Sequence, residues 1–243
     1  MNILIFDNEN EISTASGSLI ASQVTEKPNA VLGLATGSTA LIPYKTMIRL
    51  YEEKAVSFAG VTSFNLDEYC GLDVHNENSY YSFMHDNLFR HIDICEDNTH
   101  FLNGNAENTE AECAAYDKMI EAAGGIDIQL LGIGSDGHIA FNEPCGHFPE
   151  GSHIVTLDER TIRDNARFFN SIDEVPTQAL TMGIGSIMRA RKILLIATGE
   201  NKAQAVQQMV EGEISPMCPA SVLRLHPNAT IMLDRAAASL LKK

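Results

Sequence analysis

A stretch near the middle of the chain, LLGIGSDGHIAFNEP (residues 130–144), restricts the fold and the chemistry of this protein more than any other. It continues an apolar run that starts at Ile126, and three glycines then interrupt it. Asp136, His138 and Glu143 lie within eight positions of one another. Because glycine permits the backbone conformations of tight turns, the pattern predicts a buried strand that ends in a turn. An imidazole between two carboxylates can be held in one tautomer and can move protons near neutral pH.

The glycines at 132, 134 and 137 also spell G-x-G-x-x-G, the fingerprint of dinucleotide-binding proteins. In that fingerprint the residue before the third glycine approaches a pyrophosphate at a helix N-terminus. Here that residue is Asp136, whose charge would repel the pyrophosphate. Asp158 does lie about twenty residues further on, where a ribose-binding acid is expected. A dehydrogenase therefore stays open as the weaker interpretation.

The composition limits the class of protein and its partners. The 243 residues fit one α/β domain spanning residues 1–243, and the formal net charge of -15 argues against a nucleic-acid partner or an anionic membrane surface. The five cysteines include no C-x-x-C pair, which predicts free thiols in a reducing compartment and no metal site built from cysteine. No apolar run is long enough for a membrane span, and no signal peptide is recognisable. We therefore expect a cytoplasmic protein.

Three other stretches repeat the design of a buried strand followed at once by a small polar turn. The strands are predicted at 30–35, 61–66 and 192–197, and the turns after them at 36–39, 66–69 and 198–202. Helices are predicted at 8–24, 41–51, 78–92, 107–123 and, closing the chain, 236–241. Apolar strands that alternate with helices are typical of a parallel sheet with both faces covered. The four turns would then share the carboxyl edge of the sheet, where α/β proteins bind ligands.

Two of these turns carry features of an anion site. Gly37, Ser38 and Thr39 form a small polar turn before a helix, so their N–H groups can surround an anion. A helix cap by Ser38 or Thr39 explains the same residues equally well. Lys202 opposes the dipole of the helix that it begins, unless an anion docks there. Arg167, beside two aromatic residues, is either a phosphate clamp or an ordinary surface side chain.

The shared edge would bring these turns together with several ionisable side chains. Asp67 follows a predicted strand directly, although taken alone it is more often a cap or turn residue. With Asp136, His138, Glu143 and Lys202 around one crevice, the edge predicts a site for a small phosphorylated molecule that undergoes proton transfer.

Seven longer motifs resemble those of the glucosamine-6-phosphate deaminase family. They are GLATGST (33–39), FNLDEYCGL (64–72), SYYSFMH (79–85), NGNA (103–106), GIGSDGHIAFNEP (132–144), NARFF (165–169) and ALTMGI (179–184). The resemblance covers nearly the whole chain. It implies a three-layer α/β/α Rossmann-like fold with a mostly parallel sheet. It also implies conversion of glucosamine 6-phosphate to fructose 6-phosphate and ammonia in amino-sugar catabolism, without a metal or redox cofactor.

The resemblance also implies a role for each catalytic candidate. His138 would catalyse opening of the pyranose ring, and Asp136 and Glu143 would orient it and tune its charge. Asp67 would take the C2 proton and return it at C1. This division makes chemical sense, because a C2 proton becomes acidic only in the open-chain form, so ring opening and enolisation need separate bases.

The phosphate would be held by Gly37, Ser38 and Thr39, with Lys202 and Arg167. The region where larger relatives carry basic effector-binding residues has His153 and Val155 here, which predicts a compact, non-allosteric enzyme, a monomer or small homo-oligomer.

Two other functions on the same fold stay open. A 6-phosphogluconolactonase-like hydrolase would share the phosphate cradle but needs no base at C2. A non-catalytic sugar-phosphate sensor would have no use for Asp67, Asp136, His138 and Glu143 together. Whether the amino sugar has the gluco or the galacto configuration depends on one hydroxyl contact, which the sequence does not specify.

Overall fold

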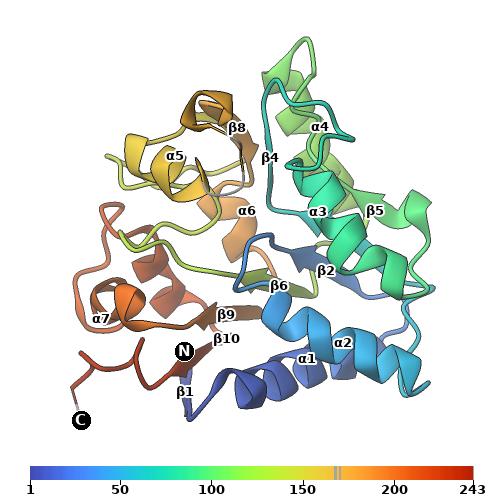
Figure 1. The fold of residues 1–243 in the computed structure, drawn as a ribbon, viewed down its shortest axis with the longest axis horizontal. Helices are drawn as coiled ribbons and strands as arrows, with labels where there is room; N and C mark the ends of the chain where they lie inside the picture. The colour runs from blue at the N-terminus through green and yellow to red at the C-terminus, as the bar shows by residue number, and fades with distance from the viewer. Residues whose placement is uncertain (167–168, 170, 243) are drawn as a thin grey trace.

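A parallel sheet runs through the centre of the molecule (Figure 1). The computed structural model describes residues 1–166, 169 and 171–242. Within these residues the sheet has seven strands in the order β1-β10-β9-β6-β2-β3-β5, and every neighbouring pair is parallel. Their bounds are β1 (Asn2–Phe6), β2 (Val31–Leu34), β3 (Thr62–Asn65), β5 (Thr99–His100), β6 (Ile128–Leu131), β9 (Ile193–Ala197) and β10 (Ala229–Asp234).

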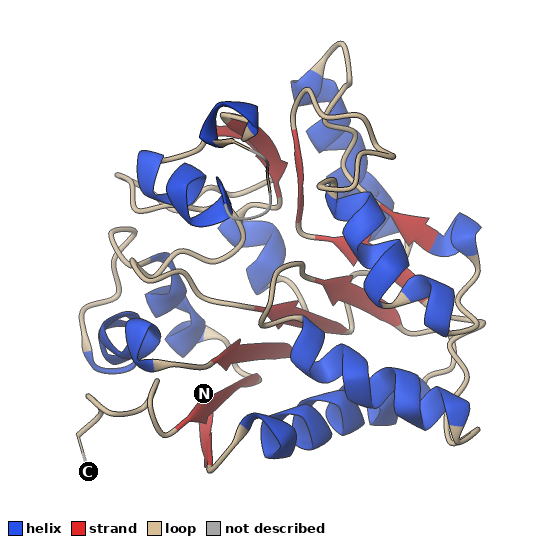
Figure 2. Cartoon of the chain, viewed as in Figure 1, coloured by secondary structure: helices blue, strands red, loops and turns tan. Residues whose placement is uncertain are grey.

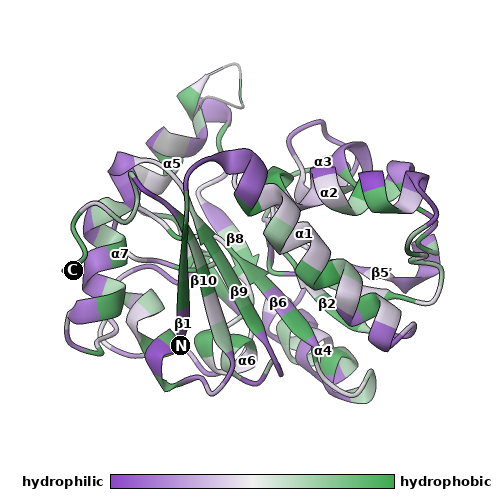
Figure 3. Ribbon diagram, turned by 90° about the horizontal axis from the view of Figure 1, so that it is seen from below, coloured by the Kyte–Doolittle hydropathy of each residue, from purple (hydrophilic) through white to green (hydrophobic). Residues whose placement is uncertain are grey.

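Helices cover both faces of this sheet, which confirms the predicted three-layer α/β/α fold (Figures 2 and 3). Helices α1 and α2 pack side by side on one face, and α4 and α6 lie on the other. The bounds are α1 (Glu9–Glu26), α2 (Leu41–Glu52), α3 (Tyr80–Asn87), α4 (Thr109–Ala122), α5 (Glu159–Asn165), α6 (Ile184–Met188) and α7 (Ala203–Glu211). Several begin at caps that the sequence provides. The side chains of Asn8 and Asn108 accept the N–H groups of Glu11 and Ala111 at the starts of α1 and α4.

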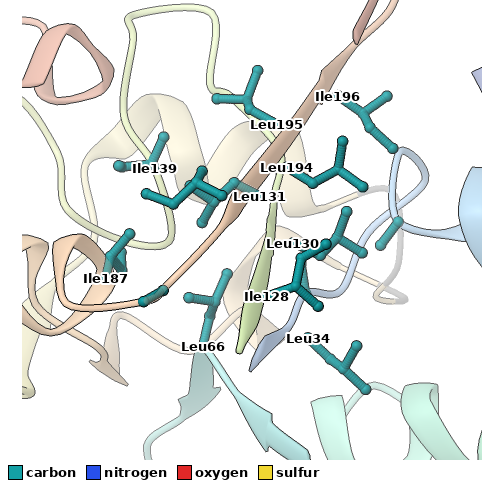
Figure 4. Packing of buried hydrophobic residues seen from close by; sticks show 14 of the residues in the cluster. Leu34, Leu66, Ile128, Leu130, Leu131, Ile139, Ile187, Leu194, Leu195 and Ile196 are labelled. Carbon is teal, nitrogen blue, oxygen red and sulfur yellow. The ribbon is translucent and has the colours of Figure 1, made fainter. Parts of the chain in front are cut away.

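The hydrophobic core lies between the sheet and its helices. Every residue of β2, β6 and β9 is buried, as expected for strands covered on both faces. Figure 4 shows Leu131, Leu194 and Leu195 packed within this core together with Leu66. Removing so much apolar surface from water stabilises the fold by roughly 25 cal/mol per Å². The core therefore fixes the ends of the strands, from which the polar turns emerge.

A second, antiparallel sheet of three strands was not predicted. It consists of β4 (Asp67–Tyr69), β8 (Gln178–Thr181) and β7 (His153–Thr156), in the order β4-β8-β7. Leu66 joins the two sheets, because its N–H donates to Leu34 and its carbonyl accepts from Met182. The chain thus leaves the main sheet after β3, and Asp67 begins a new strand instead of ending the previous one.

Two helix predictions need correction. The closing helix expected at 236–241 is wrong, because this segment forms only turns. The Asp234 carboxylate accepts the N–H groups of Gly199 and Ala237 here, and so short a segment cannot nucleate a helix by itself. The helix expected at 78–92 ends at Asn87 and is followed by a short 3-10 segment, Phe89–His91. No helix among the described residues has the length and apolarity to cross a membrane.

Candidate active site

The polar turns at the carboxyl edge of the main sheet surround one pocket of about 680 Å³. Six of the residues that the sequence analysis proposed line it: Gly37, Ser38, Thr39, Asp67, His138 and Lys202. Asp136 and Glu143 are not among the lining residues and are described below. Arg167, the remaining candidate, lies outside the described residues. The structure therefore brings together residues from four separate segments of the chain.

The turn after β2 forms a cradle of backbone N–H groups. Gly37 has φ +89°, a left-handed conformation that favours glycine, and its carbonyl accepts the N–H of Ala40. Among the described residues, no hydrogen bond uses the N–H groups of Gly37, Ser38 or Thr39. Neither hydroxyl caps α2, because the cap position is Ala40 and receives no side-chain hydrogen bond. The helix-cap interpretation of this turn is therefore wrong, and the N–H groups are available to an anion.

The turn after β9 contributes a cation to the same pocket. Gly199 has φ +90° and donates its N–H to Asp234 at 2.9 Å, which holds the turn against the end of β10. The following residues, Asn201 and Lys202, line the pocket just before α7. An anion in the pocket would thus meet the positive charge of Lys202 and the N–H groups of the cradle.

The turn after β6 places His138 against Asp136. Nδ1 of His138 lies 2.7 Å from Oδ1 of Asp136, and the same oxygen accepts the N–H of His138 at 3.1 Å. Gly134 must be glycine, because a Cβ there would collide with the imidazole ring. Burial alone would raise the pKa of Asp136, but the hydrogen bonds and the charge of His138 outweigh it and lower this pKa to about 2.

Glu143 has different partners from those expected. Its carboxylate accepts the N–H of Asp158 at 2.9 Å and the hydroxyl of Thr161, so it is attached to the start of α5. Thr161 also lines the pocket. In this structure Glu143 thus connects the loop after His138 to a helix that covers the pocket. Its proposed influence on His138 stays a prediction.

Asp67 lies in the pocket at the beginning of β4 and is only 6% exposed. Loss of hydration in this buried position, with a smaller contribution from the charge of Glu68, raises the pKa of Asp67 to about 8. A buried carboxyl group of this kind is a stronger base than an ordinary aspartate. The pocket therefore contains two groups able to transfer protons, Asp67 at the beginning of β4 and His138 on the turn after β6.

Other pocket residues were missed by the sequence analysis. Arg163 and Asn165 come from α5, which was not predicted because its seven residues show no apolar periodicity. Tyr80 and Phe141 form an aromatic wall, with ring centroids 6.0 Å apart and nearly parallel planes. No spacing in the sequence distinguishes an aromatic pocket wall from a hydrophobic core.

The dinucleotide interpretation is wrong on structural grounds. After Gly137 the chain forms a tight bridge between Ile139 and Asn142, and the next helix of the described chain is α5. The fingerprint requires a helix that begins at its glycines and presents its N-terminus to a pyrophosphate. Among the described residues, no group of three or more His, Cys, Asp or Glu side chains is arranged to hold a metal ion.

Comparison with known proteins shows the family. Residues 9–232 match the family model described as glucosamine-6-phosphate isomerases/6-phosphogluconolactonase. The chain is 50% identical to a glucosamine-6-phosphate deaminase of Clostridium botulinum, over 99% of this chain and 97% of that protein.

Two solved structures extend the comparison. One is a monomeric glucosamine-6-phosphate deaminase, with a TM-score of 0.97 and 46% identity over 99% of this chain and 100% of that one. The other is a 6-phosphogluconolactonase of Trypanosoma cruzi, with a TM-score of 0.78 and 21% identity over 100% and 97%, a likeness of fold alone. The chain therefore belongs to the glucosamine-6-phosphate isomerase/6-phosphogluconolactonase family.

Proposed function

We propose that this protein is a glucosamine-6-phosphate deaminase, which converts glucosamine 6-phosphate and water to fructose 6-phosphate and ammonia. The observation that carries the proposal is that Asp67 and His138 line the same pocket as the N–H cradle. A phosphate bound at the cradle leaves the sugar within reach of two separate proton-transferring groups. Relatives named for this activity share about half of this chain's residues over nearly its full length.

The phosphate group binds at the turn of Gly37, Ser38 and Thr39. Their N–H groups donate to its oxygens, and Lys202 balances its charge. Arg163 of α5, which also lines the pocket, adds a second cation. Arg167 keeps the phosphate-binding role that the family resemblance implies.

His138 catalyses ring opening. It takes the proton of the C1 hydroxyl and delivers a proton to the ring oxygen, so the pyranose becomes the open-chain aldehyde. Asp136 holds the imidazole through Nδ1, which leaves Nε2 for the sugar. Glu143 supports this turn and, through Thr161, the start of α5.

Asp67 catalyses the isomerisation. It removes the C2 proton of the open-chain sugar, and the electrons of that bond form the C1=C2 double bond of an enolamine. The aldehyde oxygen at C1 becomes a hydroxyl by taking a proton from the ammonium group of the sugar, which becomes a neutral amine. The same carboxyl group returns a proton at C1, which leaves an imine at C2. Water then adds to C2 and the nitrogen leaves as ammonia. The raised pKa of Asp67 suits it both to accept this proton and to give it back.

Ammonia release tests the proposal directly. Purified protein is mixed in separate reactions with glucosamine 6-phosphate, its galactosamine epimer and 6-phosphogluconolactone. We expect equal amounts of ammonia and fructose 6-phosphate from glucosamine 6-phosphate. Hydrolysis of the lactone without ammonia from either amino sugar would establish the lactonase instead. Binding without any turnover would establish a sensor.

The cellular setting follows from the same proposal. The protein acts on a small sugar phosphate in amino-sugar catabolism, and its net charge of -15 disfavours nucleic acid as a partner. The five cysteines are free, which suits the reducing cytoplasm. We propose that it works as a monomer, as the similar deaminase of known structure does.

A further inference from the structure

The carboxylate of Glu68, next to Asp67 in the chain, accepts three backbone N–H groups. Oε1 accepts from Tyr69 at 2.9 Å and from Tyr80 at 3.0 Å, and Oε2 accepts from Tyr81 at 2.9 Å. The residue is 6% exposed. Burying a charge without partners is costly, and these three N–H groups supply the partners that a buried Glu68 carboxylate needs.

The first consequence is mechanical. Tyr80 and Tyr81 are the first residues of α3, so Glu68 fastens this helix to β4 at the position beside Asp67. Tyr80 and Phe83 of α3 line the pocket. The hydrogen bonds therefore set the distance between the proposed base and the aromatic wall opposite the sugar.

The second consequence is electrostatic. Burial raises the pKa of Glu68, while the N–H groups of Tyr80, Tyr81 and Tyr69 oppose this rise, and the helix N-terminus also favours a negative charge. Among the described residues, no N–H or hydroxyl group donates to the carboxylate of Asp67. Of the two adjacent acids, Glu68 is thus the one whose negative charge is stabilised by backbone N–H groups of the protein.

Asp67 also faces ionisable groups on other elements. Its charge contributes to the raised pKa values of three tyrosines, Tyr69 of β4, Tyr80 of α3 and Tyr116 of α4. His138, Lys202 and Arg163 share the pocket with it. The tyrosines have raised pKa values and stay neutral, so the negative charge that raises the pKa of Asp67 comes from Glu68.

We propose that Glu68 is a positioning residue for Asp67, which fixes β4 to the start of α3 and holds a negative charge beside the base. This inference rests on the proposed deaminase function for its catalytic meaning. The repulsion from Glu68 disfavours the ionised form of Asp67 and so strengthens it as a base. Glu68 itself does not touch the reacting atoms.

The test compares three variants with the wild type. Glu68→Gln keeps the shape and removes the charge. Glu68→Asp keeps the charge but shortens the reach to α3. Ser79→Ala is the matched control, because it removes the other cap of α3, the acceptance of the Ser82 N–H by the Ser79 hydroxyl at 3.0 Å, without changing any charge.

The expected results differ among the variants. When kcat/KM is plotted against pH, the acidic limb reports the ionisation of Asp67. In Glu68→Gln this limb moves to lower pH by about one pH unit, and kcat falls because Asp67 is a weaker base. In Ser79→Ala the limb stays in place. In Glu68→Asp the limb stays while kcat falls about tenfold, since a small misplacement of the base slows proton transfer.

Two results would overturn the inference. One is a folded Glu68→Gln protein whose acidic limb coincides with that of the wild type. The other, decisive even if the Gln variant fails to fold, is a Glu68→Asp protein with the kcat of the wild type. A 13C NMR titration of the Asp67 carboxyl group, in wild type and Glu68→Gln, gives the same comparison without substrate. If the wild type releases no ammonia, the proposed function fails, and this titration still decides the role of Glu68.

Discussion

Nδ1 of His138 lies 2.7 Å from Oδ1 of Asp136, and the same oxygen accepts the backbone N–H of His138. A single carboxylate thus fixes both the ring and the backbone of the histidine. The glycine at 134 makes room for the ring. This arrangement commits one nitrogen of the imidazole to the protein and leaves the other for the pocket.

Asp136→Asn tests this arrangement. The amide cannot stabilise a charged imidazole and favours the wrong tautomer, so we expect kcat for ammonia release to fall at least about a hundredfold, with little change in KM. Steady-state kinetics with glucosamine 6-phosphate measure this effect. Asp97→Asn makes the same change at an exposed residue that does not line the pocket, and it serves as the control. Equal rates for Asp136→Asn and the wild type would exclude a role for Asp136 in ring opening.

Asp67→Asn should stabilise the protein above neutral pH. The pKa of Asp67 is about 8 in the folded state and about 4 in the unfolded chain. Between about pH 4 and pH 8 the folded state therefore keeps a proton on Asp67 that the unfolded chain has released. The stability of the wild type therefore falls as pH rises through this window, and an uncharged Asn avoids the loss. We expect a Tm higher than that of the wild type by about 5 °C at pH 8.5, with a much smaller difference at pH 4. Thermal unfolding followed by circular dichroism measures both values, and a difference that does not grow with pH would refute the buried-charge explanation.

Thr161→Val removes the hydroxyl that Glu143 accepts while keeping the size of the side chain. Losing one hydrogen bond of about 1 kcal/mol loosens the start of α5, which carries Arg163 over the pocket. We predict that KM rises about fivefold and that kcat changes less than twofold. If kcat falls while KM stays constant, Glu143 and Thr161 act on the chemical step and not on the covering helix.

Lys202→Gln should weaken phosphate binding. The charge-assisted hydrogen bond to a phosphate is lost, so KM for glucosamine 6-phosphate and the inhibition constant of inorganic phosphate should both rise at least tenfold. Lys118→Gln, on the exposed face of α4, is the matched control. An unchanged inhibition constant would place the phosphate elsewhere in the pocket.

The sequence predicted the strands whose burial on both faces requires a continuous run of apolar residues. Strands β2, β6 and β9 are buried on both faces, so their apolar runs predicted them directly. The polar turns after them were predictable for the same reason, since the end of each apolar run is abrupt. The pocket followed from one further rule, that parallel strands end at a common edge.

The remaining features depend on contacts between distant segments. Strand β4 has three residues and exists because it pairs with β8, far away in the chain. Helix α5 begins where Glu143 accepts the N–H of Asp158, and no local sequence pattern indicates that contact. The aromatic wall of Tyr80 and Phe141 likewise joins two segments that only the folded chain brings together.

The central claim is that Asp67 is the base for a sugar bound in this pocket. Ammonia release from glucosamine 6-phosphate by the wild type and by Asp67→Asn, measured side by side at pH 8, tests it most directly. We predict steady release by the wild type and a rate at least about a hundredfold lower for the variant, with phosphate inhibition unchanged. A folded Asp67→Asn protein that releases ammonia at the wild-type rate would contradict the account.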